Sequence, residues 1–239
     1  MKTVLILGAN SDVAKKSILM YAEKGYSVIA ASRNTNELLK FVEESSLTKN
    51  LVDVVYFDAE DFNSHKEFYN NLPQKPHIVV YAAGYLVEND SALKNFQSAS
   101  TMMSVNYIGA VSILNLVALD LENNRLERII GLSSLSGVRG RKSNFIYGST
   151  KAAFTQYLAG LRQELFSRKI IVNVLVIGYI NTKINAGLSL NKKLLMQPDY
   201  VAKYIVGAGN SFVIVPNWKW KTIYNILKIL PEYWVAKLP

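Results

Sequence analysis

The sequence has no cysteine and only two histidines among its 239 residues. The lack of cysteine excludes disulfides, thiolate nucleophiles and cysteine-ligated zinc sites. His65 lies in a polar segment and His77 begins an apolar run, and neither belongs to a cluster of metal-ligating residues. A serine hydrolase would need a histidine base and a Gly-x-Ser-x-Gly turn, a motif that the sequence also lacks. We therefore expect no metal centre and no hydrolytic triad.

Long apolar runs and acidic residues are also scarce. No apolar stretch reaches the roughly 20 residues of a membrane-spanning helix, and the run at residues 3–7 is too short for a signal peptide. We therefore expect a cytoplasmic protein. The 18 acidic residues are outnumbered by 27 Lys and Arg, which gives a net charge of +9. Such a charge favours an anionic substrate or cofactor. Nucleic acid is not an expected partner, because no nucleic-acid motif or dense basic stripe is present.

Segments with the pattern of buried strands alternate with helical segments along residues 1–215. Strands are expected at 3–7, 26–31, 51–57, 77–82, 126–132, 169–177 and 212–215, and helices at 12–25, 35–46, 61–71, 99–122, 144–168 and 198–208. This alternation predicts an α/β domain of the Rossmann type: a doubly wound parallel sheet of about seven strands with helices on both faces. Residues 183–197 are the least regular and follow a strand end, so we interpret them as a substrate lid.

The turn after the first expected strand has the small and polar residues of a phosphate-binding turn. In this architecture the turn holds phosphates against a helix N-terminus. Gly8 permits the tight bend, and Asn10 and Ser11 offer polar groups. At the end of the second strand, Ser32 and Arg33 present a hydroxyl and a cation where an adenosine ribose would lie. An acidic residue is typical of NAD sites, whereas arginine attracts a 2′-phosphate, so this pair predicts NADP; a solvated arginine is the alternative.

Tyr147 and Lys151 are four residues apart in an expected helix, so their side chains share one face. Tyrosine has an unperturbed pKa near 10, and a nearby ammonium would lower that pKa and suit the phenol to act as a general acid. The same spacing occurs at Tyr179/Lys183, Tyr224/Lys228 and Tyr233/Lys237. Only Tyr147 follows a strand-end serine, Ser134, whose hydroxyl can steady a substrate oxygen, and this context selects Tyr147 and Lys151.

These motifs follow one another in the order of the short-chain dehydrogenase/reductase family, which the chain resembles over residues 1–215. The resemblance implies that Tyr147 is the catalytic acid/base and that Lys151 holds the nicotinamide ribose and lowers the tyrosine pKa. It implies that Ser134 orients the substrate carbonyl and that Asn106 supports a water-linked proton relay to the lysine. The residues expected to contact the cofactor, NADP, are Gly8, Asn10, Ser11, Asp12, Val13, Ser32, Arg33, Asn34, Asp58, Ala59, Ala83, Gly84, Tyr147, Lys151, Gly178, Ile180 and Thr182.

Within this set, the resemblance implies that Asp58 contacts the adenine and that Ile180 and Thr182 contact the nicotinamide carboxamide. It also implies homodimers or homotetramers formed through the two long helices. The chain departs from the family pattern in the first turn, where Asp12 and Ala14 replace the second and third glycines. A carboxylate near a pyrophosphate would repel it, but Asp12 can instead cap the helix N-terminus.

Other departures lie at two strand ends. Tyr81 and Ala82 replace an asparagine pair, and Ile177 replaces a proline. None of these changes removes a catalytic group, so the resemblance still implies an enzyme.

The composition changes after residue 215, and residues 216–239 are expected to form an amphipathic C-terminal tail. Tryptophans and lysines flank an apolar helix face, as in helices that lie in a membrane interface. The residues expected on that face are Trp220, Ile223, Ile226, Leu227 and Leu230. Packing on the domain or on a second subunit is the alternative to contact with the inner face of the cell membrane. The tail and the first turn are similar to those of reductases of polyprenyl-phosphate-linked keto-sugars, which implies a keto-sugar substrate.

The sequence therefore predicts an NADPH-dependent oxidoreductase that reduces a ketone to an alcohol or catalyses the reverse reaction. One alternative is a non-catalytic NADP-binding module tethered by its C-terminal helix, and another is a structural subunit with a decayed cofactor site. The complete set of Asn106, Ser134, Tyr147 and Lys151 favours the enzyme, because a binding module needs no general acid.

Overall fold

The structure is a computed structural model of the chain, and it describes residues 1–45, 50–183 and 191–237. At the centre of the described part lies a sheet of seven parallel strands in the order β3-β2-β1-β4-β5-β6-β7, as the alternating sequence pattern predicts. The strands are β1 (Thr3–Leu7), β2 (Ser27–Ser32), β3 (Val52–Tyr56), β4 (Ile78–Tyr81), β5 (Arg128–Ser134), β6 (Ile171–Ile177) and β7 (Val213–Ile214). Chain order reverses between β1 and β4, the point where doubly wound sheets form a crevice for ligands.

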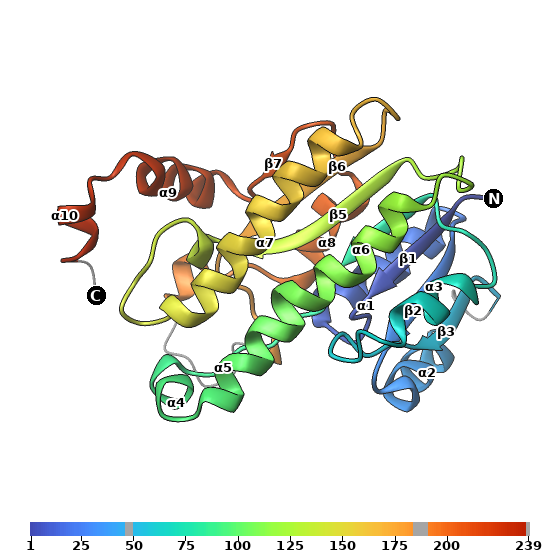
Figure 1. Ribbon diagram of the computed structural model, residues 1–239, viewed down its shortest axis with the longest axis horizontal. Helices are drawn as coiled ribbons and strands as arrows, with labels where there is room; N and C mark the ends of the chain where they lie inside the picture. Colours follow the sequence, from blue (N-terminus) through green and yellow to red (C-terminus); the bar gives the residue numbers. More distant parts are fainter. Residues whose placement is uncertain (46–49, 184–190, 238–239) are drawn as a thin grey trace.

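Helices cover both faces of the sheet (Figure 1). The face toward the viewer carries α3 (His65–Asn70), α5 (Phe96–Met103), α6 (Gly109–Leu119) and α7 (Phe145–Glu164). Behind the sheet, α1 (Asp12–Glu23) packs against α8 (Pro198–Val206), and α2 (Thr35–Glu44) packs on β2 and β3. The last two helices, α9 (Trp218–Ile229) and α10 (Glu232–Val235), follow β7 and extend to the left of Figure 1.

The central strands are buried because helices cover both sides of the sheet. Every residue of β1 and β2 is buried, and residues 4–7 have none of their surface exposed. This burial on two faces explains the continuous apolar runs in the sequence. The pairing register aligns Leu7 of β1 with Ala31 of β2 and with Tyr81 of β4. The turns that follow these three strands are thereby brought together at one edge of the sheet.

The structure differs from the expected elements between residues 85 and 122. An unpredicted short helix, α4 (Asn89–Lys94), precedes α5, and a π-helical turn (Ser104–Ile108) separates α5 from α6. Residues 96–119 together are long and apolar enough to cross a membrane by length and composition, contrary to the expectation from the sequence. Half of the relevant window is buried in the domain, and a core helix of a soluble protein meets the same criterion.

Candidate active site

A cavity of about 480 Å³ lies at the carboxyl ends of the strands. Its walls come from the turns after β1, β2 and β4, the end of β5, the start of α7, the segment after β6 and helix α9. The expected site residues that line it are Gly8, Asn10, Ser11, Asp12, Val13, Ser32, Arg33, Asn34, Ala59, Ala83, Gly84, Ser134, Tyr147, Lys151, Gly178, Ile180 and Thr182. Asp58 and Asn106 do not belong to the lining. The structure therefore brings all but two of the expected residues to one cavity.

The turn after β1 depends on Gly8. Its backbone has a φ of +83°, which residues with side chains rarely adopt, and a Cβ atom there would collide with the backbone of Ala83. The turn leads into α1, where the Ser11 hydroxyl caps the helix by accepting a hydrogen bond from the Ala14 amide (3.1 Å). The cap is thus formed by Ser11, and the interpretation of Asp12 as the capping residue is wrong.

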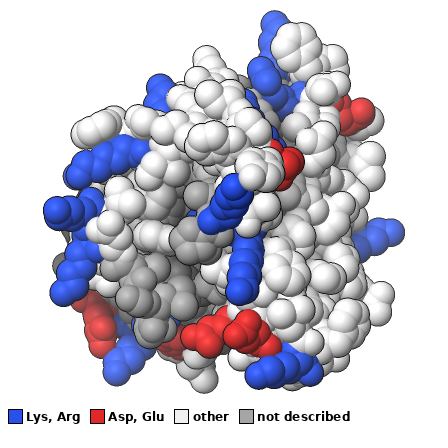
Figure 2. Space-filling view, turned by 90° about the vertical axis from the view of Figure 1, so that its left-hand side faces the viewer, with Lys and Arg blue, Asp and Glu red and all other residues white. Residues whose placement is uncertain are grey.

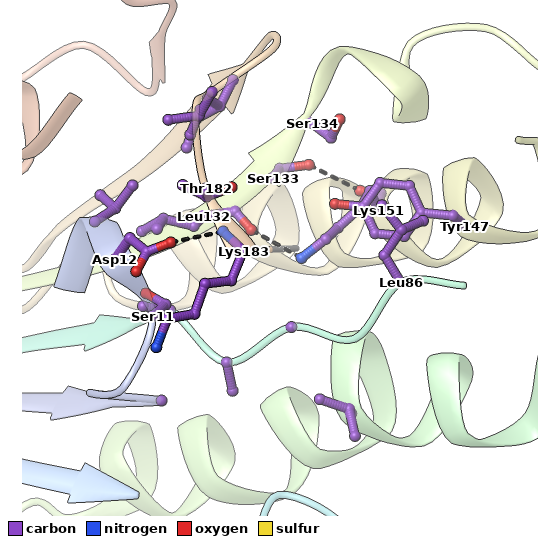
Figure 3. A pocket seen from close by; sticks show the side chains of 18 of the residues that line it. Ser11, Asp12, Leu86, Leu132, Ser133, Ser134, Tyr147, Lys151, Thr182 and Lys183 are labelled. Carbon is purple, nitrogen blue, oxygen red and sulfur yellow. Dashed lines mark hydrogen bonds between the residues drawn. The ribbon is translucent and has the colours of Figure 1, made fainter. Parts of the chain in front are cut away.

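Asp12 instead binds the segment that follows β6. Its carboxylate accepts a hydrogen bond from the backbone N–H of Lys183 (2.8 Å), as Figure 3 shows. The Lys183 ammonium lies 3.2 Å from the carboxylate of Glu37, which Lys15 also binds at 2.7 Å. Hydrogen bonds from Lys15 and Lys183 lower the pKa of Glu37. Asp12 therefore fastens the first residue of the expected lid beside the cavity. Residues 184–190 of that lid lie outside the described residues.

The expected adenosine end of the cavity contains a network of polar groups. The Asn10 amide donates hydrogen bonds to the Ser32 hydroxyl (2.8 Å) and to the Asn34 carbonyl (2.7 Å). Its Oδ1 atom is buried and has no hydrogen-bond partner among the described residues. Because a buried acceptor without a donor is unfavourable, this atom suits a ligand hydroxyl.

Arg33 lies beside two acidic residues at the end of β2. Its half-exposed guanidinium is 3.3 Å from the carboxylate of Glu60 and 3.9 Å from that of Asp58. The Asp58 carboxylate also accepts a hydrogen bond from the Glu60 N–H (2.9 Å). Asp58 is thus adjacent to the lining residue Ala59 but is not itself a lining residue. Exposed ion pairs contribute little to stability, and a phosphate group can therefore compete for Arg33.

Tyr147 and Lys151 project from the start of α7 toward the end of β5 (Figure 3). Lys151 is buried, with 4 % of its surface exposed. Its ammonium donates a hydrogen bond to the Leu132 carbonyl (3.1 Å), and burial lowers its pKa to about 8. Burial raises the pKa of Tyr147 to about 12, although the Ser134 hydroxyl acts in the opposite direction. The tyrosine pKa is thus raised rather than lowered as expected, because burial has the larger effect.

The two serines at the end of β5 differ in their contacts, and of the two only Ser133 has a hydrogen bond drawn in Figure 3. The Ser133 hydroxyl donates to the Lys151 carbonyl (3.1 Å) and lies 2.7 Å from the Thr155 hydroxyl, so it anchors β5 to α7. The Ser134 hydroxyl lines the cavity and accepts a hydrogen bond from the Ser136 N–H (3.1 Å). Of the two, Ser134 is thus the serine whose hydroxyl is not engaged with α7 and is available at the reacting centre.

Asn106 lies in the π-helical turn and is fully buried. Its amide donates to the Tyr85 carbonyl (2.9 Å) and to the Thr150 hydroxyl (3.1 Å), and its Oδ1 accepts from the Tyr85 N–H (2.8 Å). A Cβ atom placed on Gly84 would lie 3.6 Å from Asn106 Oδ1 and 3.8 Å from Lys151 Nζ. Asn106 and the Lys151 ammonium therefore lie close to the same point beside Gly84.

Helix α9 forms one wall of the cavity, which the sequence analysis did not predict. Trp220 is 5 % exposed, its indole N–H donates to the Leu194 carbonyl (2.9 Å), and its ring lies where a Cβ atom on Gly178 would be. Leu227 lines the same cavity, whereas Ile226, expected on the apolar face, is 49 % exposed. The inner face of α9 thus packs on the domain. An amphipathic pattern signals that a helix has an inner face but not which groups it covers.

Comparison with known proteins identifies the family. A model of the short chain dehydrogenase family matches residues 2–193, and the chain belongs to this family of oxidoreductases. An uncharacterized oxidoreductase of Mycobacterium tuberculosis is 24 % identical over 99 % of this chain and 96 % of its own length. A 3-oxoacyl-[acyl-carrier-protein] reductase of Thermotoga maritima is 27 % identical over 76 % of this chain and 75 % of its own.

Solved structures share the fold over nearly the whole chain. A short chain dehydrogenase from Burkholderia cenocepacia in complex with NADP has a TM-score of 0.82 at 18 % identity, covering 98 % of this chain and 97 % of that one. A short-chain dehydrogenase from Sphingobium yanoikuyae in complex with NADPH has the same TM-score and identity, covering 100 % and 97 %. The doubly wound sheet is therefore the fold of this family.

Proposed function

We propose that the chain is an NADPH-dependent reductase of a ketone in which Tyr147 is the general acid. The observation that supports this proposal is the convergence of Ser134, Tyr147 and the buried Lys151 on a cavity that Gly8 and Arg33 also line. A cavity at the carboxyl ends of parallel strands, with an acid–base group and a cation in its lining, suits a dinucleotide and a small carbonyl compound.

The lining residues fit NADPH. The unpartnered Asn10 Oδ1 and the Ser32 hydroxyl suit the adenosine ribose, and Arg33 suits its 2′-phosphate. The N-terminus of α1 suits the pyrophosphate, and Ile180 and Thr182 suit the carboxamide. Bound in this way, NADPH supplies the hydride. The complexes of structural neighbours with NADP and NADPH support the choice of cofactor.

Residues of the chain itself orient the substrate oxygen and supply its proton. The Ser134 hydroxyl orients the carbonyl oxygen, and Tyr147 donates a proton to it. Burial raises the pKa of Tyr147 to about 12, so at neutral pH the phenol carries the proton that the reduction requires. Lys151, with a pKa of about 8, is charged at neutral pH and can return a proton to the tyrosine. Asn106 holds the water-linked relay behind the lysine.

The proposed substrate is a keto-sugar, carried in the natural reaction by a polyprenyl phosphate. The similarity of the first turn and the tail to reductases of such sugars supports this proposal, and so does a cavity that combines polar groups with an apolar wall from α9. NADPH consumption should be measured with a panel of keto-sugars and with simple ketones of similar size. Activity confined to the simple ketones would contradict the keto-sugar assignment and leave the reductase in place.

Replacing Arg33 by serine should weaken NADPH binding and leave NADH binding unchanged. The variant loses the charge-assisted hydrogen bonds to a 2′-phosphate, so we expect the Kd for NADPH to rise by about 10- to 100-fold. Fluorescence titration of the unmodified chain and of the variant with NADPH and with NADH measures these Kd values. Glu60→Gln is the matched control, because it removes a partner of Arg33 and keeps the cation. Similar affinities of the unmodified chain for NADPH and NADH would exclude this role of Arg33.

The proposed location is the cytoplasm, at the inner face of the cell membrane. Trp218, Ile229, Tyr233 and Trp234 of the last two helices are exposed. Figure 2 views the side on which α10 lies in Figure 1, and Lys and Arg side chains are spread over this face. Interfacial aromatic and basic residues suit an anionic lipid surface. Trp218→Ala/Trp234→Ala should reduce co-sedimentation with anionic vesicles; sedimentation equal to that of the unmodified chain would count against membrane contact.

The proposed assembly is a homodimer or homotetramer formed through the helices α5, α6 and α7. Exposed apolar side chains at these helices, including Phe96, Leu119 and Phe145, support the proposal. Sedimentation equilibrium of the full chain tests it, and a monomer at micromolar concentration would contradict it.

A further inference from the structure

Four cationic side chains line the described part of the cavity, and three of them already have a partner or a role. Arg33 and Lys183 form ion pairs with carboxylates, and Lys151 stands at the reacting centre. The fourth is Arg141, in the loop between β5 and α7. Among the described residues, no carboxylate forms an ion pair with Arg141. Arg141 therefore adds to the lining a positive charge that no carboxylate of the described residues neutralises.

Arg141 is connected to the reacting centre by two hydrogen bonds. Its Nη2 donates to the Ser136 hydroxyl (3.3 Å), and the Ser136 N–H donates to the Ser134 hydroxyl (3.1 Å). The Arg141 Nε–H is buried and has no acceptor in the part of the chain that the structure describes. A buried donor without an acceptor costs free energy, and an anionic oxygen that reaches this atom would remove that cost.

The neighbouring Arg139 provides a comparison within the same loop. Its guanidinium donates to the Lys228 carbonyl (2.8 Å). Its Nε, which is also buried without a hydrogen-bond acceptor among the described residues, lies 3.5 Å from the Glu232 carboxylate and forms an ion pair with it. These contacts tie the loop to the C-terminal helices, and Arg139 does not line the cavity. The two arginines thus differ in two respects: Arg139 forms an ion pair outside the lining, whereas Arg141 belongs to the lining and has no ion pair among the described residues.

We propose that Arg141 binds an anionic group of the substrate, a carboxylate or a phosphate, next to the carbonyl that is reduced. This inference rests on the proposed reductase function and specifies its substrate class. A guanidinium can donate two parallel hydrogen bonds to either anion. Helix α9 adds an apolar wall through Trp220, Ile223 and Leu227. The substrate that fits the cavity therefore carries an anionic group and an apolar portion.

Calorimetric titration of the NADPH-saturated protein tests this proposal with three probes: octanoate, octyl phosphate and the neutral octanamide. We expect at least one anion to bind about tenfold more tightly than octanamide, and Arg141→Gln to abolish that difference. Whichever anion binds more tightly identifies the preferred group. Lys142→Gln is the matched control, because it removes the same charge from an exposed position in the same loop and should keep the preference. Arg141→Lys keeps the positive charge but cannot donate two parallel hydrogen bonds, so it should retain part of the preference for anions.

Three results would overturn the proposal: equal binding of the anions and octanamide, a preference for anions that survives in Arg141→Gln, or no binding of any probe. A prior NADPH titration of each protein distinguishes a failure of the proposed reductase function from a failure of the proposed role of Arg141. A chain that does not bind NADPH contradicts the proposed function itself. A chain that binds NADPH but shows no preference for anions contradicts only the role of Arg141.

Discussion

Replacing Tyr147 by phenylalanine should lower kcat by about 10²- to 10⁴-fold, the range that a positioned general acid contributes. The variant loses the hydroxyl that lies next to Ser134 but keeps the aromatic ring and its packing at the start of α7. Folding and cofactor affinity should therefore be unchanged. Steady-state NADPH consumption with a reducible ketone measures the loss, and NADPH titration of the same preparation measures the retained affinity.

Tyr157→Phe is the matched control for this experiment. Tyr157 lies on the same helix, but its hydroxyl donates to Asn115 (2.8 Å) and it does not line the cavity. We expect the control to keep full activity. Undiminished turnover by the Tyr147 variant would remove Tyr147 from the mechanism, while a loss of NADPH binding would indicate that the substitution disturbs the site as a whole.

Replacing Trp220 by alanine should lower the free energy of unfolding by about 3–5 kcal/mol, the usual cost of truncating a large buried aromatic side chain. The variant loses the contact with Gly178 and the hydrogen bond from the indole N–H to the Leu194 carbonyl. It also opens one wall of the cavity. Urea unfolding of the full chain, followed by circular dichroism, gives the change in free energy.

Trp218→Ala provides a comparison on the same helix. Trp218 is 73 % exposed, and its replacement should change the free energy of unfolding by less than about 0.5 kcal/mol. Similar effects of the two substitutions would contradict the packing of α9 on the domain. If only the Trp220 variant has a much lower free energy of unfolding, α9 belongs to the folded unit, although the composition changes after residue 215.

Local patterns in the sequence predicted the strands and the glycine turn, because each of them is encoded in consecutive residues. Continuous apolar runs mark strands that are buried on two faces, and Gly8 marks a backbone conformation that other residues avoid. The spacing of Tyr147 and Lys151 correctly placed both side chains on one helix face. Spacing does not measure burial, however, and burial moves the two pKa values in opposite directions.

The features that the sequence analysis missed depend on contacts between distant parts of the chain. The Asp12 carboxylate binds the backbone N–H of Lys183, which lies far along the chain. The sequence around either residue contains no pattern that predicts this contact. The same is true of Trp220 on Gly178. Helix α4 and the π-helical turn lack a regular apolar period, so periodicity could not predict them.

The walls of the cavity come from both halves of the sheet and from the C-terminal helix α9. A ligand that fills the cavity is therefore bound only when these distant segments are assembled, and its binding free energy is linked to the folding equilibrium. For a ligand at 100 times its Kd, this linkage adds about 2.7 kcal/mol to the free energy of unfolding. Saturation with cofactor would thus offset much of the destabilisation expected for a lost tryptophan, and the lifetime of the folded chain in a cell would follow the supply of its ligand.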